Sequence, residues 1–240
     1  MNRSRVCILF LAFVLSGCGG KHAAEPGLQV GEEALRNGSP QIALQVAQGI
    51  LSRSPADKQA LLMKGDAATQ LGQNTDAEAA FLQVLTQDPQ SVHGQIGLGR
   101  LRLGTDAAAA ATLFEDVLRR EPANLNALNN VGIARDLLGQ HQDAQAAYRK
   151  ARSIDPSNIA ARVNLALSLA MTGNAPEALA LIEPLANDPS GSTKLRHDYA
   201  AVLAMGGRER DAEAVLSHDL SPPEIKQVLE AFRQQRAGGG

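Results

Sequence analysis

The residue types that most often carry catalysis or bind metals are scattered along this 240-residue chain. The histidines, which could ligate a metal or move protons, are His22, His93, His141, His197 and His218. None of them stands at metal-ligand spacing from another histidine, a cysteine or a pair of carboxylates. No Gly-x-Ser-x-Gly elbow is present to expose a nucleophilic serine. These patterns predict no enzyme activity, no metal site and no cofactor.

A cluster of glycines offers one further candidate for chemistry, a phosphate-binding loop. Gly94, Gly97, Gly99 and Gly104 lie close together. Their order is not that of the dinucleotide fingerprint, and no predicted strand precedes them. Small residues at the contact between two helices explain these glycines better.

Cys18 has the surroundings of a modification site. Arg3 and Arg5 precede an apolar run, residues 6–14, which is too short to span a bilayer. The tetrapeptide Leu-Ser-Gly-Cys follows at residues 15–18. This ending resembles a bacterial lipobox, which implies cleavage before Cys18 and acylation of its sulfur and its new amino group. An unlipidated signal with a chance cysteine is the alternative.

This interpretation divides the start of the chain into two segments. We expect residues 1–17 to be a cleaved signal peptide and residues 18–27 to be a lipidated tether. Cleavage would remove Cys7, so Cys18 would be the single cysteine left and no internal disulfide could form. Gly19 stands where enterobacterial lipoproteins of the inner membrane have Asp. The resemblance therefore implies the periplasmic face of the outer membrane.

The composition favours a helical protein that does not bind nucleic acid. Hydrophobic residues make up 44% of the chain and aromatic residues only 3%. Alanine and leucine supply the apolar content, and both favour helices over strands. The net charge of −2 provides no basic field, and stacking platforms for bases are scarce.

A regular internal repeat decides the fold class. Alanines recur at positions 43, 77, 110, 144, 178 and 212, and prolines at positions 55, 89, 122, 156 and 189. This period, about 34 residues, is typical of tetratricopeptide (TPR) repeats, each of which is a pair of antiparallel helices. The sequence therefore predicts an all-α fold. Residues 28–220 are expected to form a right-handed superhelical solenoid of about six TPR helix pairs.

Single residues within the repeats have predictable structural roles. In the fourth repeat, Gly132 should let the second helix approach closely, and Tyr148 should fill the space between neighbouring repeats. Gly139 should supply the left-handed turn that ends the first helix. Pro156 should stop the second helix. In the fifth repeat, Pro184 should kink or shorten the second helix.

The pattern at the end of the chain predicts one more helix. Residues 221–224, Ser-Pro-Pro-Glu, are a helix start with Ser as N-cap and Glu three places on. Ile225, Val228, Leu229 and Phe232 form one apolar face. We expect residues 221–236 to be a helix that caps the last repeat, and residues 237–240 to be a loose tail.

The first helices of the repeats should line a concave binding face. The residues expected there, as a peptide-binding groove, are Leu62, Met63, Asp66, Asn126, Asn129, Asn130, Ile133, Val163, Asn164, Leu167, Met171 and His197, together with Gln59, Asp136, Lys194 and Asp198. The apolar members suggest a groove for a helix or an extended segment of a protein partner. Ala160 and Ala161 stand where a two-carboxylate clamp needs lysine, which argues against a chaperone C-terminus as the ligand.

Three of these residues, Asn130, Asn164 and Asp198, occupy the same position in successive repeats. One interpretation is a polar ladder that hydrogen-bonds the backbone of an extended peptide. The other is that these side chains bond the backbone between adjacent repeats. The sequence leaves both open.

The chain also resembles a family of pilus proteins. The resemblance rests on Leu-Asn-Asn-Val-Gly at 128–132, Asn-Leu-Ala-Leu-Ser-Leu-Ala at 164–170, Ala-Glu-Ala at 212–214 and Asp-Leu-Ser-Pro at 219–222. Together with the lipobox-like start, these segments resemble the TadD lipoproteins of the Tad (Flp) pilus system. Residues 196–203 and 228–232 depart from the pattern expected for that family.

The resemblance implies a pilotin-like function. Such a protein would help the outer-membrane secretin assemble, so that a Flp pilus can be extruded. Another periplasmic TPR adaptor lipoprotein is the alternative, serving type IVa pilus secretins or envelope and peptidoglycan machinery. A third interpretation is an enzyme or its regulatory subunit.

Overall fold

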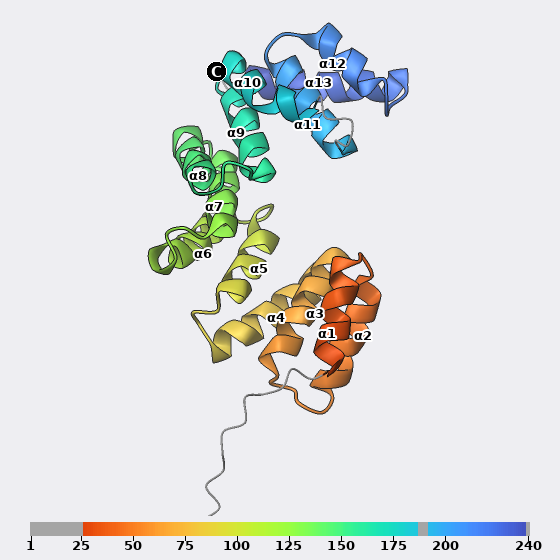
Figure 1. The fold of residues 1–240 in the computed structure, drawn as a ribbon, viewed down its shortest axis with the longest axis vertical. Coiled ribbons are helices and arrows are strands. Elements are labelled where there is room, and N and C mark those ends of the chain that lie inside the picture. The colour runs from red at the N-terminus through yellow and green to blue at the C-terminus, as the bar shows by residue number, and fades with distance from the viewer. Residues whose placement is uncertain (1–25, 187–191, 239–240) are drawn as a thin grey trace, which may run out of the picture.

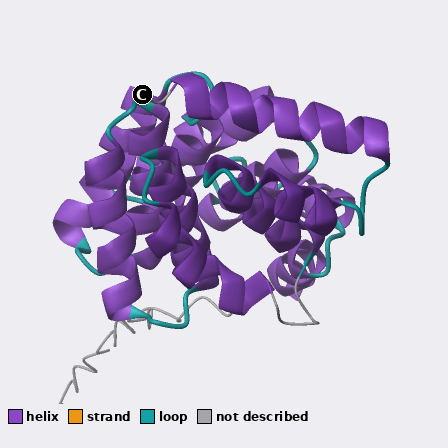
Figure 2. Ribbon diagram, turned by 90° about the horizontal axis from the view of Figure 1, so that it is seen from above, coloured by secondary structure: helices purple, strands orange, loops and turns teal. Residues whose placement is uncertain are grey.

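The computed structural model describes residues 26–186 and 192–238. Within these ranges the chain forms thirteen α-helices and no strand (Figures 1 and 2). Residues 1–25, which include the expected signal peptide and the expected lipidation site Cys18, lie outside the described residues. The first helix begins at Pro26, inside the segment that the sequence assigned to the tether.

Twelve of the thirteen helices form six successive pairs, which confirms the predicted TPR solenoid. The pairs are α1 (Pro26–Arg36) with α2 (Pro40–Leu51), α3 (Lys58–Gln70) with α4 (Asn74–Gln87), α5 (Val92–Arg102) with α6 (Ala107–Arg120), α7 (Leu125–Leu137) with α8 (His141–Ile154), α9 (Ile159–Met171) with α10 (Ala175–Ala186), and α11 (Thr193–Met205) with α12 (Glu209–Leu216). The pairs follow one another along the long axis of the molecule (Figure 1).

Glycine ends the first helix in five of the six pairs. Gly139 has a φ of +73°, as its predicted left-handed turn requires, and equivalent glycines have φ between +69° and +81°. The third pair is the exception, because the repeat is one residue shorter there. Leu103 stays in the helical region and the backbone N–H of Asp106 reaches back to the Arg102 carbonyl at 2.7 Å.

The contact inside each central pair joins a glycine to an aromatic ring. A methyl group at Gly132 would lie only 2.3 Å from the Tyr148 ring, so the two helices meet there at a distance that only glycine permits. The same relationship holds between Gly65 and Phe81. Both rings are fully buried, and Tyr148 belongs to a core cluster that also contains Leu165 and Ala166 of the next pair, which confirms the roles that the sequence indicated for Gly132 and Tyr148.

The last helix, α13 (Pro222–Gly238), packs against α11 and α12. Ile225 and Leu229 are buried in the same core cluster as the residues of α11. At its start, Glu224 accepts hydrogen bonds from the backbone N–H and the hydroxyl of Ser221, at 2.8 and 2.5 Å. The helix continues beyond the expected end at Arg236, into the segment that the sequence assigned to a loose tail.

Pro184 lies inside α10 and the helix continues past it to Ala186. With 12 residues, α10 is shorter than the second helices α4, α6 and α8, which have 14 residues each. Proline has no N–H to donate, so α10 lacks one backbone hydrogen bond at Pro184.

Candidate peptide-binding groove

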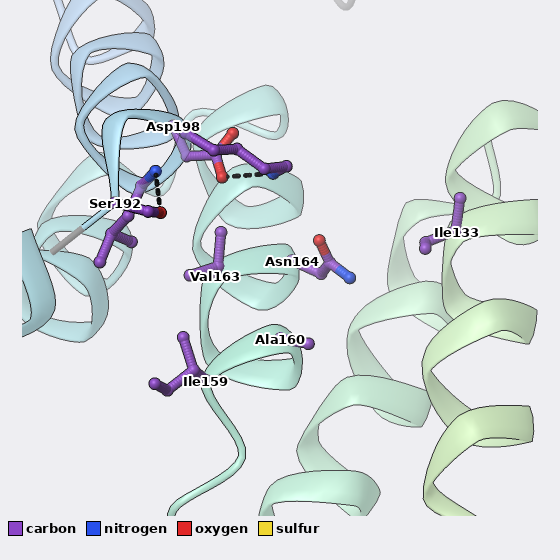
Figure 3. A pocket seen from close by; sticks show the side chains of 9 residues that line it. Ile133, Ile159, Ala160, Val163, Asn164, Ser192 and Asp198 are labelled. Atoms are coloured by element: carbon purple, nitrogen blue, oxygen red, sulfur yellow. Dashed lines mark hydrogen bonds and ion pairs between the residues drawn. The ribbon is translucent and has the colours of Figure 1, made fainter. Parts of the chain in front are cut away.

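Two hollows lie along the first helices, one on each side of α7. The apolar hollow has a volume of about 540 Å³ and is lined by Ile133, Ile159, Ala160, Val163, Asn164, Ser192, Lys194, Leu195 and Asp198 (Figure 3). The polar hollow has a volume of about 420 Å³ and is lined by Asp66, Val92, His93, Ile96, Gly97, Arg100, Asn124, Asn126 and Asn130. Helix α7 contributes to both, so we treat them as two parts of one groove.

Aliphatic side chains from α7 and α9 form the walls of the apolar hollow. Ile159 is the first residue of α9 and is 56% exposed, although it is a large hydrophobic residue. It is held there because Asn158 caps the helix by accepting a hydrogen bond from the Ala161 N–H at 2.9 Å. Val163, one turn further along α9, is 5% exposed. Figure 3 shows Ile133 opposite this helix.

Polar groups at the edge of the apolar hollow keep some hydrogen-bonding capacity. Lys194 is 80% exposed and donates to Asp198 Oδ2 at 2.6 Å. The Asn164 amide donates to Asn129 Oδ1 at 2.8 Å, which leaves Asn164 Oδ1 as an acceptor. Ser192 Oγ accepts from the Leu195 N–H at 3.2 Å, which leaves its hydroxyl hydrogen as a donor.

The polar hollow contains a histidine–aspartate hydrogen bond and an arginine without a partner among the described residues. His93 Nε2 lies 2.8 Å from Asp66 Oδ2, and this hydrogen bond raises the pKa of His93 against the opposing effect of burial. Arg100, in the last turn of α5, makes neither an ion pair nor a hydrogen bond with any of the described residues. Arg100 is therefore the cation of the polar hollow that has no partner among the described residues.

The three residues that recur at one repeat position form three different bonds. Asn164 bonds to Asn129 of the preceding pair, whereas Asn130 donates to the Asn126 carbonyl of its own helix at 2.8 Å. Asp198 accepts from Lys194 on its own helix. The bond between neighbouring repeats thus forms at Asn164, and it joins two side chains rather than a side chain and the backbone.

The structure brings only part of the expected residue set to the groove. Asp66, Asn126, Asn130, Ile133, Val163 and Asn164 line the hollows, as do Lys194 and Asp198. Leu62 and Met63 are 6% and 4% exposed and belong to the core, so their expected place in the groove was wrong. Met63 is buried because Gly31 of α1 has no side chain and leaves room for the Met63 sulfur.

Other residues that were expected in the groove make their contacts in other parts of the fold. Leu167 and Met171 pack against the C-terminal core cluster. His197 is half-buried, with Nε2 3.7 Å from Asp219 Oδ2, and lines neither hollow. Asn129 takes part only through its bond to Asn164.

Asp136 lies at the centre of a polar network that holds two repeats together. Its carboxylate accepts hydrogen bonds from the Tyr148 hydroxyl at 3.0 Å and the Ser168 hydroxyl at 2.8 Å. His141 Nδ1 lies 2.9 Å from the same carboxylate. Burial, and then the charge of Asp136, raise the pKa of Tyr148. Asp136 was expected on the binding face, but its acceptor capacity is used inside the fold.

Several groove residues were missed from the sequence, among them His93, Arg100, Ile159 and Leu195. A signal for some of them was present, because His93, Asn126, Ala160 and Lys194 occupy one shared position in four successive repeats. Arg100 and Ile133 share another position in the third and fourth repeats.

No group of three or more His, Cys, Asp or Glu residues that could hold a metal ion occurs in residues 26–186 and 192–238. In the same ranges, none of the helices combines the length and the apolar character that crossing a bilayer demands.

Comparison with known families agrees with the fold. Models of the tetratricopeptide repeat match residues 28–92, 97–159 and 137–189. The chain therefore belongs to the tetratricopeptide repeat family, whose members are generally non-enzymatic scaffolds that bind protein partners.

The sequence matches to related proteins cover only part of each relative. The uncharacterized protein y4yS of Sinorhizobium fredii is 35% identical over 97 residues, which cover 40% of this chain and 53% of that protein. An FK506-binding protein-like protein of Mus musculus is 36% identical over 75 residues, 31% of this chain and 21% of that protein. The chain thus spans about half of the first relative and about a fifth of the second.

Solved structures share the fold at low identity. PilW, described as a widely conserved type IV pilus biogenesis factor, superimposes with a TM-score of 0.73 at 21% identity and covers 85% of this chain and 96% of PilW. A tetratricopeptide repeat protein of Parabacteroides merdae gives a TM-score of 0.69 at 18% identity, with coverage of 89% and 87%. These likenesses concern the fold alone.

Proposed function

We propose that this TPR scaffold is a lipid-anchored, pilotin-like protein on the periplasmic face of the outer membrane. It binds a protein partner through the two hollows and helps the secretin of a Tad (Flp) pilus assemble. The observation that carries the binding role is the apolar hollow, in which Ile159 stays exposed beside Ile133 and Val163. Exposed aliphatic surface in a concave site is a common feature of partner-binding sites.

The anchor and the pilus role have separate support. The Leu-Ser-Gly-Cys ending at residues 15–18 supports lipidation of Cys18. The resemblance of residues 128–132, 164–170 and 219–222 to TadD lipoproteins supports the secretin as the partner. Several acyl chains would hold the protein firmly, because each buried CH₂ contributes about 0.8 kcal/mol to membrane binding.

The proposal is tested in cells with three variants. Cys18→Ser should remove the protein from the outer membrane and reduce surface pili, while the protein keeps its helicity. Ile159→Asp should leave the protein at the membrane but reduce secretin captured by affinity purification. Ile154→Asp is the matched control, because Ile154 is also exposed, at 42%, but lines neither hollow.

Two results would overturn the proposal. Cys18→Ser protein found in the outer membrane with normal pili would exclude both the anchor and the escort role. Equal secretin capture by Ile159→Asp and wild type would exclude the apolar hollow as the binding site.

A second candidate is an adaptor for the secretin of a type IVa pilus. The observation that favours it is the likeness to the fold of PilW. The same capture experiment separates the two candidates, because mass spectrometry of the purified complex identifies which secretin is bound.

A further inference from the structure

We propose that the two hollows together receive one internal segment of the protein partner, with branched aliphatic side chains at one end and side-chain carboxylates at the other. The inference rests on the proposed function, because it takes the groove to be the site that binds a protein. It adds the chemistry of the bound segment and the direction in which that segment lies.

The apolar hollow requires an aliphatic end. Ile133 and Ile159 present hydrocarbon surface from two helices, and covering this surface removes it from water. The hollow's volume of about 540 Å³ lies in the size range of ligand-binding pockets in proteins. At its edge, Asn164 Oδ1 can accept from the segment's backbone N–H, and the Ser192 hydroxyl can donate to a backbone carbonyl.

The polar hollow requires carboxylates. Its one aspartate, Asp66, is already held by His93 at 2.8 Å, whereas the Arg100 guanidinium has no partner in the part of the chain that the structure describes. A guanidinium pairs best with a carboxylate. The side chains of Asn126 and Asn130 line the same hollow and can bond the carboxylate or the peptide backbone. Protonation of His93 balances the charge of Asp66, so that the charge of Arg100 remains uncompensated in the hollow at mildly acidic pH.

Helix α7 makes the two hollows one site. Asn126 and Asn130 of this helix line the polar hollow, and Ile133 lines the apolar hollow. Asn130 and Ile133 are less than one helical turn apart, so a segment that crosses α7 passes from one hollow to the other within about 5 Å along the helix axis. The carboxylates therefore lie over α5, and the aliphatic residues lie over α9 and α11.

The position of Arg100 at the end of a helix has another explanation, which is tested by a control variant at a second arginine. Arg100 lies in the last turn of α5, where a cation also interacts favourably with the helix dipole. Arg152 lies in the last turn of α8 and lines neither hollow. Substituting either arginine with alanine removes one charge from a helix end, but only Arg100→Ala removes it from the groove.

The test uses synthetic peptides and the full chain purified in detergent. Each peptide is acetylated, amidated and fluorescein-labelled, and has an aliphatic half of Ile, Leu and Val. The other half contains glutamates in the first peptide and glutamines in the second. Fluorescence anisotropy measures Kd for both peptides with wild type, Arg100→Ala, Arg152→Ala, Ile159→Asp and Ile154→Asp, at low and at high salt.

We expect the glutamate peptide to bind about three- to tenfold more tightly than the glutamine peptide at low salt, with a smaller difference at high salt. Arg100→Ala should abolish this preference, and Arg152→Ala should keep it. Ile159→Asp should weaken both peptides by about tenfold, and Ile154→Asp should change neither. A nitroxide on the aliphatic end should broaden amide resonances of α9 more than those of α5.

Equal affinity for the two peptides, a preference that survives Arg100→Ala, or broadening centred on α5 would each overturn the inference. These outcomes are distinct from a failure of the proposed function. Peptides that bind as expected while no secretin is captured from cells support the inference and contradict the secretin role. Secretin captured equally by wild type and Arg100→Ala, without a glutamate preference, supports the secretin role and contradicts the inference.

Discussion

The side-chain amide of Asn164 in α9 donates a 2.8 Å hydrogen bond to Asn129 in α7, and so joins the fifth helix pair to the fourth. Asn130 occupies the same repeat position as Asn164, in the preceding repeat, yet its amide bonds to the Asn126 carbonyl one turn back on its own helix. Two identical side chains at equivalent positions therefore act differently, one between repeats and one within a helix.

This difference predicts different effects of two alanine substitutions. Asn164→Ala should lower the free energy of unfolding by about 1 kcal/mol, because a half-buried hydrogen bond between repeats is lost. Asn130→Ala should change it by less than about 0.5 kcal/mol, because the helix keeps its backbone bonds. Urea denaturation followed by circular dichroism compares the two. Equal destabilisation would contradict the distinction.

A second prediction concerns the contact between Gly132 and Tyr148. Gly132→Ala should destabilise the protein by about 1–3 kcal/mol, because the new methyl group would lie 2.3 Å from a fully buried ring. Gly49 of α2 is the control, since no heavy atom outside its own helix lies within 4 Å of the position of an added methyl group. Gly49→Ala should stabilise the helix by about 0.5–1 kcal/mol. Thermal melts measure both, and a Gly132→Ala variant as stable as wild type would show that the helices can separate without cost.

The third prediction is a dependence of stability on alkaline pH. Burial, together with the Asp136 carboxylate, raises the pKa of Tyr148 above its unfolded value of about 10. A group with a raised pKa in the folded state contributes stability that is complete below the unfolded pKa and is lost as the pH rises above it. The free energy of unfolding should therefore fall between about pH 10 and 12, and fall less in Tyr148→Phe.

Urea midpoints of wild type and Tyr148→Phe across this pH range provide the measurement. At neutral pH the variant should already be less stable by about 1 kcal/mol, because the hydrogen bond to Asp136 is gone. Tyr199→Phe serves as the comparison for the second tyrosine, whose pKa is also raised by burial. Parallel pH curves for wild type and Tyr148→Phe would refute the prediction.

The fourth prediction concerns the last helix. Deleting residues 221–240 removes Ile225 and Leu229 from the core cluster that contains Tyr199, Val202 and Leu216. It also removes Arg233, which bonds to Glu209 of α12 through two nitrogens, at 3.1 and 2.8 Å. End repeats of a solenoid depend on such a cap. Amide hydrogen exchange should therefore speed up in α11 and α12 but not in α3 to α6.

Deleting only residues 239–240 is the control and should leave exchange unchanged. Unaltered protection of α11 and α12 in the longer deletion would mean that α13 does not stabilise the sixth pair.

Features that depend on the nearest residues followed directly from the sequence. The regular period of alanines and prolines predicted six helix pairs, because each pair contacts mainly its neighbours and the same small and apolar residues must recur at each contact. Gly139 and Ser221 marked helix ends correctly, since a left-handed turn and an N-cap are determined by the backbone close by. The turn inside the third helix pair differs from the other five turns, because one residue is missing from that repeat.

The content of the groove was decided only by the tertiary structure. Periodicity placed Met63 and Ile133 on first helices, but Met63 is buried because Gly31 leaves space for it, whereas Ile133 remains at the wall of a hollow. The Asp136 carboxylate likewise accepts hydrogen bonds from Tyr148 and Ser168 inside the fold, and so does not face the groove as a free acceptor. Helical spacing fixes the direction in which a side chain leaves its own helix. Whether that side chain meets a neighbour or open space depends on the size of residues in other repeats, and therefore on packing across the whole solenoid.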